Sequence, residues 1–424
     1  MKKRTHLIAP LLIAGAALSF GSCSKDNLAT DPVSTSTSSA SKIQNPTLGN
    51  EYIADQYIVT MNSPLIKTAI DGITNYDLRN EALVPFITQV LDVAGIDSKN
   101  IGSVYNTVFF GFSVKATAEQ INRLAASPLV SFIEQDQVMR VLGQVDAKAA
   151  PANLKAQTVN YGVTRVGSGS GTGKRAWVLD TGIDLDHPDL NVNRTLSKSF
   201  ISSGGGGLLG GGLFGGGGGS ASPDDQNGHG THCAGIIGAL DNTIGSKGVA
   251  YGAEVVAVQV LGSNGSGSTS VIIQGVDYVA ANARPGEVAN MSLGGGVNTS
   301  LDNAVINASN RGIWFVLAAG NSSANANNSS PARANGTYIL TISSMDSQDR
   351  LSSFSNFANP PIDFAEPGSS IYSTYRNGGY STLSGTSMAA PHAAGLILLR
   401  GGKPAAGGFI TGDRDNTPDV IGVR

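Results

Sequence analysis

Cysteine is scarce in this chain of 424 residues, which contains only Cys23 and Cys233. Because Cys23 falls within the first two dozen residues, in a leader-like segment, we expect no disulfide in the rest of the chain. Charged residues are also few, at 14%, and the net charge of −3 gives no reason to expect nucleic acid as a partner. The apolar run at residues 7–20 is too short for a transmembrane helix.

The N-terminal segment, residues 1–23, has the features of an export signal. Three basic residues, Lys2 to Arg4, precede the apolar run. Cys23 follows small residues, as in a bacterial lipoprotein cleavage site, so we expect lipidation of Cys23 and a membrane tether. The alternative is ordinary secretory cleavage between Ala16 and Ser22. In both cases the protein is exported, either as a cell-envelope lipoprotein or as a secreted protein.

The segments after the signal predict a linker and a small domain. Residues 24–51 are rich in Ser and Thr and are predicted to form a flexible linker. Residues 52–141 have the pattern of an α+β, ferredoxin-like β-α-β-β-α-β module. In this module Thr117 and Gln120 form a capping box that starts the second helix.

From residue 157 to 424, which is long enough for a large domain, apolar β-rich runs alternate with helical patterns. This alternation predicts an α/β fold, a doubly wound parallel sheet with helices on both faces. The glycine-rich tract at 204–219 is predicted to be a surface insertion. We expect strands at 176–180, 254–261, 288–293, 313–319 and 338–343, and helices at 229–239, 270–283, 300–310 and 388–399.

Three separate motifs supply the groups needed for nucleophilic catalysis. Ser387 stands in Gly-Thr-Ser-Met-Ala-Ala-Pro-His, His229 in Asn-Gly-His-Gly-Thr-His, and Asp180 in Val-Leu-Asp-Thr-Gly. A serine hydroxyl attacks a carbonyl well only when a histidine takes its proton and a carboxylate orients that histidine. The order Asp, His, Ser differs from that of chymotrypsin-like enzymes and of α/β-hydrolases.

These motifs, with Asn-Met-Ser-Leu-Gly-Gly at 290–295, resemble the subtilisin-like serine proteases, closest to their proteinase K-like branch. Residues 52–141 are similar to the family's inhibitory propeptide. The resemblance implies an exported serine endopeptidase, made as an autoprocessed precursor, with protein or peptide substrates and its own propeptide as an intramolecular inhibitor. We expect autocleavage between residues 141 and 157, so that 142–156 form a processing linker.

The mechanism expected for this family is acyl transfer. Ser387 attacks the peptide carbonyl and forms an acyl-enzyme, His229 transfers the proton, and Asp180 orients His229. Ser387 is predicted to lie at a helix N-terminus, where its N–H and the side-chain amide of Asn290 stabilise the oxyanion.

The resemblance also implies that substrate adds as a β-strand between two edge segments. Small residues line the expected specificity pocket and leave room for a large side chain, which predicts broad cleavage with an apolar preference. The residues expected to bind substrate are Leu261, Gly262, Ser263, Ser292, Leu293, Gly294, Ala319, Gly320 and Asn321.

No cofactor is expected for catalysis. By similarity to the family, Asp363 and the carbonyls of Thr337 and Ile339 form a structural calcium site. Two other functions stay open. One is a catalytically inactive subtilase-fold binding protein, and the other is a metal-dependent hydrolase that uses the ligand-like side chains of His229, His232 and Cys233.

Overall fold

A computed structural model describes residues 42–47, 49–62, 64–142, 156–201 and 222–424. The chain divides into two units, residues 1–38 and 39–424, and the first lies outside the described residues. The predicted signal, Cys23 and the glycine-rich tract at 204–219 also lie outside them. None of the helices in the described ranges combines the length and the apolar character needed to cross a bilayer.

The N-terminal domain has the predicted β-α-β-β-α-β order. Its four strands form an antiparallel sheet in the order β4-β1-β3-β2. The predicted capping box starts α3, where Thr117 Oγ1 accepts the Gln120 N–H and Gln120 Oε1 accepts the Thr117 N–H. The elements are β1 (Tyr52–Met61), α1 (Pro64–Ile70), α2 (Tyr76–Ala94), η2 (Ser98–Asn100), β2 (Ile101–Tyr105), β3 (Gly111–Lys115), α3 (Ala118–Ala126) and β4 (Val130–Val141).

The C-terminal domain is built on a sheet with the order β20-β21-β17-β16-β14-β12-β6-β10-β7. All neighbouring strands from β21 to β7 in this order are parallel. Strands of such a sheet are covered on both faces and therefore read as continuous apolar runs, as in Trp-Phe-Val-Leu-Ala of β14. The strands are β6 (Arg175–Asp180), β7 (Asn191–Val192), β10 (Glu254–Gln259), β12 (Val288–Met291), β14 (Trp314–Ala318), β16 (Ile339–Met345), β17 (Ile362–Pro367), β20 (Ala405–Phe409) and β21 (Val420–Val423).

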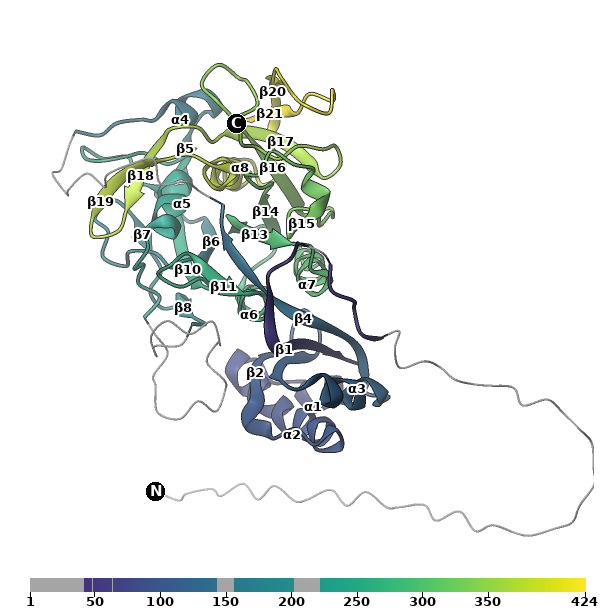
Figure 1. Ribbon diagram of the computed structural model, residues 1–424. Coiled ribbons are helices and arrows are strands. Elements are labelled where there is room, and N and C mark those ends of the chain that lie inside the picture. The colour runs from purple at the N-terminus through teal and green to yellow at the C-terminus, as the bar shows by residue number, and fades with distance from the viewer. Residues whose placement is uncertain (1–41, 48, 63, 143–155, 202–221) are drawn as a thin grey trace, which may run out of the picture. The chain divides into compact units, whose positions relative to one another are not determined.

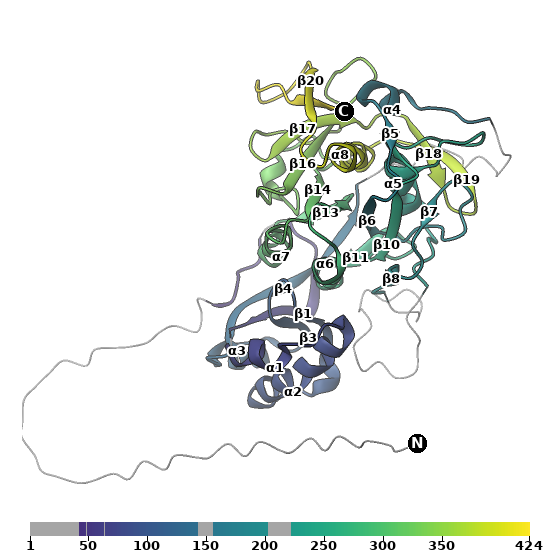
Figure 2. The same cartoon turned by 180° about the vertical axis from the view of Figure 1, so that it is seen from behind.

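Helices cover both faces of this sheet, as predicted. Neighbouring residues of β6 point to opposite faces, so Trp177 packs in one cluster with Val276 and Leu301, and Val178 in another with Ile236 and Ile397. The first cluster lies under α6 (Thr269–Asn282) and α7 (Thr299–Ser309), the second under α5 (His229–Gly238) and α8 (Thr386–Arg400). Figures 1 and 2 show these two helix layers from opposite sides.

Shorter elements complete the domain. The C-terminal tail pairs with the sheet through β21, which lies beside β17. The remaining elements are α4 (Tyr161–Val166), β5 (Gly169–Ser170), β8 (Lys198–Ser199), β9 (Ala250–Tyr251), β11 (Ser266–Ser268), β13 (Leu293–Gly296), η3 (Ala326–Asn328), β15 (Ser329–Ser330), β18 (Ile371–Tyr375) and β19 (Gly379–Leu383).

Strand β4 belongs to both domains. Its first part pairs with β1 inside the N-terminal sheet, and its last part lies between β11 and β13 of the C-terminal domain. One sheet, in the order β15-β13-β4-β1-β3-β2, therefore runs through both domains (Figure 1).

The linker predicted over residues 24–51 is not free at its C-terminal end. Gln44 N donates to Ile133 O at 2.9 Å, and Glu51 O accepts from Val138 N at 2.9 Å. Asn50 Nδ2 donates to Val297 O of the C-terminal domain at 3.0 Å. Backbone and carboxamide groups supply these contacts, which an analysis based on apolar pattern does not detect.

Candidate active site

Asp180 and His229 form a buried pair. Asp180 is the last residue of β6 and His229 the first of α5. His229 Nδ1 lies 2.8 Å from Asp180 Oδ1 and 2.9 Å from Oδ2, and the Asp180 side chain is fully buried. Because a carboxylate only accepts, Nδ1 carries the proton, and Nε2 keeps its lone pair.

The start of α5 is held by Asp225, a residue that the sequence analysis missed. Its Oδ1 accepts the N–H groups of Asn227 and Gly228, and its Oδ2 accepts the N–H and the hydroxyl of Thr231. Thr181 Oγ1, next to Asp180, donates to the same carboxylate. An Asp four residues before a predicted helix was the available signal, because such a residue can cap the helix N-terminus.

Glycine allows α5 to approach β6. A Cβ at position 230 would overlap the carbonyl oxygen of Gly182 and come within 3.1 Å of Asp180 Cβ. Only a residue without a side chain permits this approach, which sets the distance between the histidine and the carboxylate.

Ser387 lies in the first turn of α8, which begins one residue earlier, at Thr386. Its hydroxyl donates to Ser292 O at 3.0 Å, and His229 Nε2 is buried without a hydrogen-bond partner among the described residues. The structure therefore brings Asp180 and His229 into contact but shows no hydrogen bond between His229 and Ser387. Such bonds are often absent before the reactive complex forms.

In the helix expected at 388–399, Pro391 would lie in the first turn, but α8 begins earlier, at Thr386, and Pro391 lies farther inside it. Because proline has no N–H, the carbonyl of Ser387, four residues earlier, has no helical partner. That carbonyl accepts from Ser292 Oγ at 2.9 Å and from Cys233 Sγ at 3.4 Å. The proline thus leaves free an acceptor that joins Ser387 to Ser292, between β12 and β13, and to the helix that carries His229.

A peptide carbonyl lies against Ser387. The Leu142 carbonyl oxygen accepts the backbone N–H of Ser387 at 3.3 Å and a side-chain N–H of Asn321. Asn321 is fixed by its other side-chain atom, because Oδ1 accepts the N–H and the hydroxyl of Thr386, each at 2.9 Å. Two converging donors on one carbonyl oxygen have the geometry of an oxyanion hole.

Asn290, predicted as the second oxyanion donor, does not reach this carbonyl. It is fully buried, and its Nδ2 donates to Ser292 Oγ at 2.9 Å. Asn290 and Asn321 both fall at ends of parallel strands, but Asn290 is still within β12, where its side chain points into the packed interior. Asn321, three residues past the end of β14, takes the position instead.

The end of β4 occupies the cleft as an extended strand. Arg140 is paired with Ser266 on β11 and with Gly294 on β13, and Leu142 N donates to Ser292 O at 3.2 Å. The predicted edge at 292–295 therefore takes part in pairing. In the other predicted edge, at 261–267, the second half pairs through the Gly265 carbonyl, Ser266 and Gly267, and the pairing continues to Ser268.

Leu261, Gly262 and Ser263 have other partners. The N–H of Leu261 donates to Asp180 O at 3.1 Å, and that of Gly262 to Ser266 O at 2.8 Å. Ser263 O accepts from Asn227 Nδ2 at 2.9 Å. These bonds form the turn that leads into β11, so the three residues support the edge strand and do not pair with β4.

A cavity of about 350 Å³ lies beside Leu142. A Cβ at Gly294 would lie 3.1 Å from Leu142 Cδ1, so the leucine side chain rests directly on this glycine. Among the residues that line the cavity are Leu142, Gly294, Gly295, Ala318, Ala319, Gly320 and Asn321.

Carboxylates join the two domains away from the cleft. Glu134 accepts the N–H groups of Thr299 and Ser300 at the start of α7, and Asp136 accepts the N–H of Ser270 at the start of α6. These N–H groups offset part of the cost of burying the two carboxylates, although burial still raises the pKa of both. In the reverse direction, Asp277 of α6 accepts the N–H groups of residues 106–108, at 2.7 to 3.0 Å.

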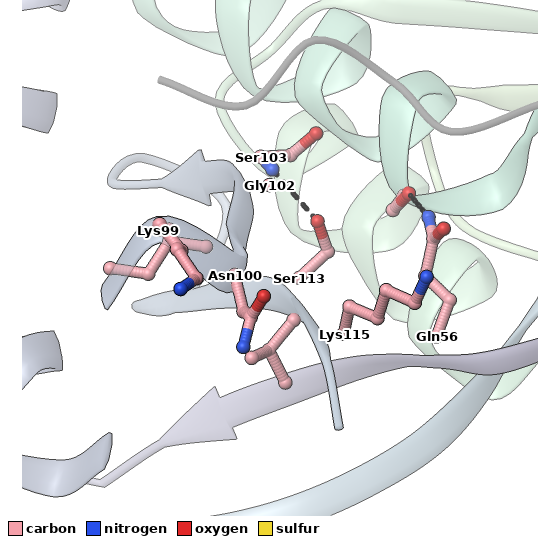
Figure 3. Close-up of a pocket in the computed structure, with 10 residues that line it drawn as sticks. Gln56, Lys99, Asn100, Gly102, Ser103, Ser113 and Lys115 are labelled. Atoms are coloured by element: carbon pink, nitrogen blue, oxygen red, sulfur yellow. Dashed lines mark hydrogen bonds between the residues drawn. The ribbon is translucent and has the colours of Figure 1, made fainter. Parts of the chain in front are cut away.

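Gln56 extends the Asp136 contact. Its Nε2 donates to Asp136 Oδ2 at 2.6 Å and to Ser270 Oγ at 3.2 Å. A second cavity, of about 160 Å³, opens beside this contact and is lined by Lys99, Lys115 and Ser103 among others (Figure 3). None of the residues predicted for catalysis or substrate binding lines it.

We expect the N-terminal domain to bind more weakly as the pH rises from about 5 to 7. Burial raises the pKa of Asp136 and of Asp277 from 3.8 to about 6 in the complex. The complex therefore takes up protons as it forms, so acid favours association, and this stabilisation is lost as the pH rises through 6. Each carboxyl changes the affinity by about tenfold over this range.

Dissociation of the cleaved N-terminal domain, followed by gel filtration at each pH, measures this effect. Asp277 also faces the hydroxyl of Tyr76, and Asp136 faces Gln56, Ser270 and Tyr105. Asp277→Asn removes one titrating group and should make the logarithmic change in affinity smaller. An affinity that stays constant or increases between pH 5 and 7 would contradict the prediction.

The ligand set predicted for a metal-dependent hydrolase does not assemble. His232 Nε2 lies 3.0 Å from Ile371 O and 3.2 Å from Ser381 O, and burial lowers the pKa of His232 to about 3. In the described part of the chain, one group of three potential metal ligands is close together, namely Asp180, His229 and Cys233. Burial raises the pKa of the Cys233 thiol well above its usual value, which disfavours the thiolate that binds metals.

The predicted calcium ligands do not form a set that suits the ion. Asp363 Oδ2 accepts the N–H of Thr341 at 3.0 Å, and Oδ1 lies 3.7 Å from the ammonium of Lys403. Calcium takes six to eight oxygen ligands, whereas this position, with the carbonyls of Thr337 and Ile339, offers one carboxylate that already faces a cation. Calcium here stays a prediction that the donor chemistry does not favour.

The parallel α/β fold, the buried Asp–His pair and a serine beside a bound peptide carbonyl together define a serine endopeptidase. The family model "Subtilase family" matches residues 176–401, and the model "Peptidase inhibitor I9" matches residues 56–142. The chain therefore belongs to the subtilase family and carries the inhibitor domain as its propeptide.

Named relatives agree with this assignment. Alkaline serine exoprotease A of Vibrio alginolyticus is 39% identical over 82% of this chain and 60% of its own length. Cuticle-degrading protease of Metarhizium anisopliae is 36% identical over 81% of this chain and 79% of its own length. Proteinase R of Parengyodontium album is 33% identical over 82% of this chain and 79% of its own length. These relatives include members of the proteinase K-like branch.

Proposed function

We propose that Ser387 is the nucleophile of this serine endopeptidase, that His229 is its general base and acid, and that Asp180 orients His229. One observation carries the proposal: the Leu142 carbonyl oxygen accepts hydrogen bonds from the Ser387 N–H and from Asn321. A peptide carbonyl is thus held against the serine by two donors, as acyl transfer requires.

The reaction follows from the hydrogen bonds of these groups. Asp180 accepts the Nδ1–H of His229, so the free Nε2 is the atom that takes a proton. In attack, the Ser387 hydroxyl leaves Ser292 O, forms a bond to the carbonyl carbon and passes its proton to Nε2. His229 then protonates the leaving amine, and water hydrolyses the acyl-enzyme by the same steps.

The negative charge that develops on the carbonyl oxygen is stabilised by two hydrogen-bond donors, the Ser387 N–H and Asn321 Nδ2. The Ser387 N–H lies in the first turn of α8, where the helix dipole favours an anion. Asn321 cannot turn away, because its Oδ1 is bound to Thr386. Preorganised donors stabilise the transition state without a reorganisation cost.

A serine-directed organophosphonate tests the assignment. After release of the propeptide, the reagent should label the enzyme once, on Ser387, and peptide hydrolysis should stop in proportion to labelling. An inactive binding protein and a metal-dependent hydrolase both predict no labelling at this serine. Activity that persists in the fully labelled enzyme would contradict the proposal.

The cavity next to Leu142 supports a preference for apolar side chains before the cleaved bond. Gly294, on which Leu142 rests, and the small residues Ala318 and Ala319 are among those that line it. Backbone pairing with β11 and β13 binds any extended peptide, so selectivity beyond this pocket is expected to be broad.

We also propose that the precursor is exported and that Cys23 carries a lipid. Export is supported by the basic residues and the apolar run of residues 1–23. The lipid is supported by the small residues just before Cys23, and a single acyl group gives only weak membrane binding, so two or more chains are needed for a stable anchor.

Detergent partitioning of the precursor measures the anchor. The unchanged precursor should enter the detergent phase, and Cys23→Ala should move it into the aqueous phase. Cys233→Ala is the matched control, because this buried thiol lies in the catalytic domain. Equal partitioning of the precursor and its Cys23 variant would exclude the lipid.

A further inference from the structure

We propose that the precursor first cuts itself at the peptide bond between Leu142 and Gly143. This inference rests on the proposed function, since the same Ser387 performs the cleavage. It goes further by naming the bond that defines the end of the propeptide and the first residue of the released enzyme.

Both backbone groups of Leu142 are held at the nucleophile. Its carbonyl oxygen accepts from Ser387 N at 3.3 Å and from Asn321 Nδ2, and its N–H donates to Ser292 O at 3.2 Å. Among the described residues, Leu142 has the one carbonyl that accepts from both of these donors. The carbonyl carbon is therefore the atom presented for attack.

Two apolar contacts and one exposed charge fix this register. Leu142 rests on Gly294, and Met139 is fully buried against Gly295. Arg140, which follows Met139, points outward and pairs with Glu51 at 2.7 Å, with 54% of its side chain exposed. If the strand advanced by one residue, Arg140 would take the apolar site that Met139 fills. Burial of an unpaired guanidinium excludes that register.

The backbone on the amino-terminal side agrees with the register. Val141 N donates to Gly265 O at 2.9 Å, and Val138, Met139 and Arg140 are paired in sequence with Ser268, Gly267 and Ser266. On its other edge the strand pairs through Arg140 and Val141 with β13, so it cannot advance without breaking bonds on both sides. The pairing of the last residues of β4 with β11 and β13 thus determines which peptide bond lies at Ser387.

The chemistry balances with one water. Ser387 Oγ bonds to the Leu142 carbonyl carbon, and the bond from that carbon to the nitrogen of Gly143 breaks. The hydroxyl proton passes through His229 to that nitrogen, which becomes the new amino terminus. Water then adds to the acyl carbon and releases Ser387, which leaves a carboxylate on Leu142 with one oxygen from the solvent.

Refolding of the full-length precursor from denaturant into water enriched in oxygen-18 tests the bond. Mass spectrometry of the first fragments should find a propeptide that ends at Leu142 with a single heavy oxygen in its carboxylate, and a partner that begins at Gly143. A first cut at any other bond would overturn the inference and leave the proposed function intact. The absence of both cleavage and peptide hydrolysis would overturn the proposed function as well.

A synthetic peptide of residues 137–147 provides an independent measurement, because it does not depend on refolding. The enzyme freed of its propeptide should cut it after the leucine, and cleavage only elsewhere would count against the inference. In the precursor, Leu142→Asp should slow processing on the order of a hundredfold, because a charge enters an apolar pocket. Leu142→Met, which keeps an apolar side chain of similar volume, should process within about threefold of the unchanged chain.

Discussion

Replacement of Ser387 by alanine is expected to leave the precursor uncut and to lower peptide hydrolysis by about a million-fold. The size of the effect is borrowed from subtilisin, in which removal of the nucleophile costs this much in kcat. The reason is that Ser387 supplies the attacking hydroxyl beside the carbonyl that Asn321 and the helix N-terminus bind. Electrophoresis of the refolded precursor and a continuous peptide assay measure the two effects.

The matched control is Ser353→Ala, which alters an exposed serine in the same domain. This variant should process and hydrolyse peptides like the unchanged chain. Ser387→Ala should still fold with the propeptide in place, because the backbone N–H and not the hydroxyl contacts Leu142. A precursor that is processed at the normal rate without Ser387 would show that another residue is the nucleophile.

Replacement of Asn321 by alanine is expected to lower kcat by about a hundredfold to a thousandfold with little change in KM. This range comes from subtilisin, in which one oxyanion-hole donor was removed. Asn321→Asp is the sharper variant, since it keeps an acceptor for Thr386 and removes the donor. Steady-state kinetics on one apolar peptide separate kcat from KM.

Asn290→Ala should behave differently, because Asn290 holds Ser292 and does not reach the carbonyl. We expect a loss of stability of about 1–3 kcal/mol, measured by thermal unfolding, because the buried Ser292 Oγ loses its hydrogen-bond donor, and only a few-fold fall in kcat. A larger loss of kcat in the Asn290 variant than in the Asn321 variant would reverse the assignment of the oxyanion donor.

This pair of asparagines marks how far the sequence could predict the site. The motifs around Asp180 and His229 predicted their contact, because each motif joins a catalytic group to a strand end or a helix start. Asn290 and Asn321 both lie near the carboxyl end of a parallel strand. Their exact positions relative to that end, Asn290 within β12 and Asn321 three residues beyond β14, decide which side chain faces the cleft. Element boundaries are the weakest part of a pattern-based prediction.

The fold itself was largely predictable from pattern. The alternation of apolar strands with helices gave the parallel sheet and both helix layers, and the capping box at Thr117 gave the start of α3. Contacts made by polar groups over long sequence separations were not predictable. Asp225 under the His229 helix and Asn50 against Val297 are of this kind.

Pro391 shows the same limit within one helix. Its position in the sequence suggested the first turn of a helix, since proline is tolerated there. The helix starts earlier, and the carbonyl that proline leaves free is used by Ser292 and Cys233. Proline is preferred in the first turn of a helix, as the sequence rule states. Its position farther inside α8 is tolerated because Ser292 and Cys233 bind the carbonyl that it leaves free.

Strand β4 belongs both to the sheet of the propeptide and to the active-site cleft. The end of β4 can therefore stay in the cleft only while the propeptide domain remains folded. If that domain unfolds, its edge strand loses β1, and the last residues of the strand can no longer be held in line. The stability of the propeptide is therefore expected to influence how long the cleft stays occupied. A destabilising substitution in the core of the propeptide, far from the catalytic groups, would shorten the time for which the enzyme stays inhibited.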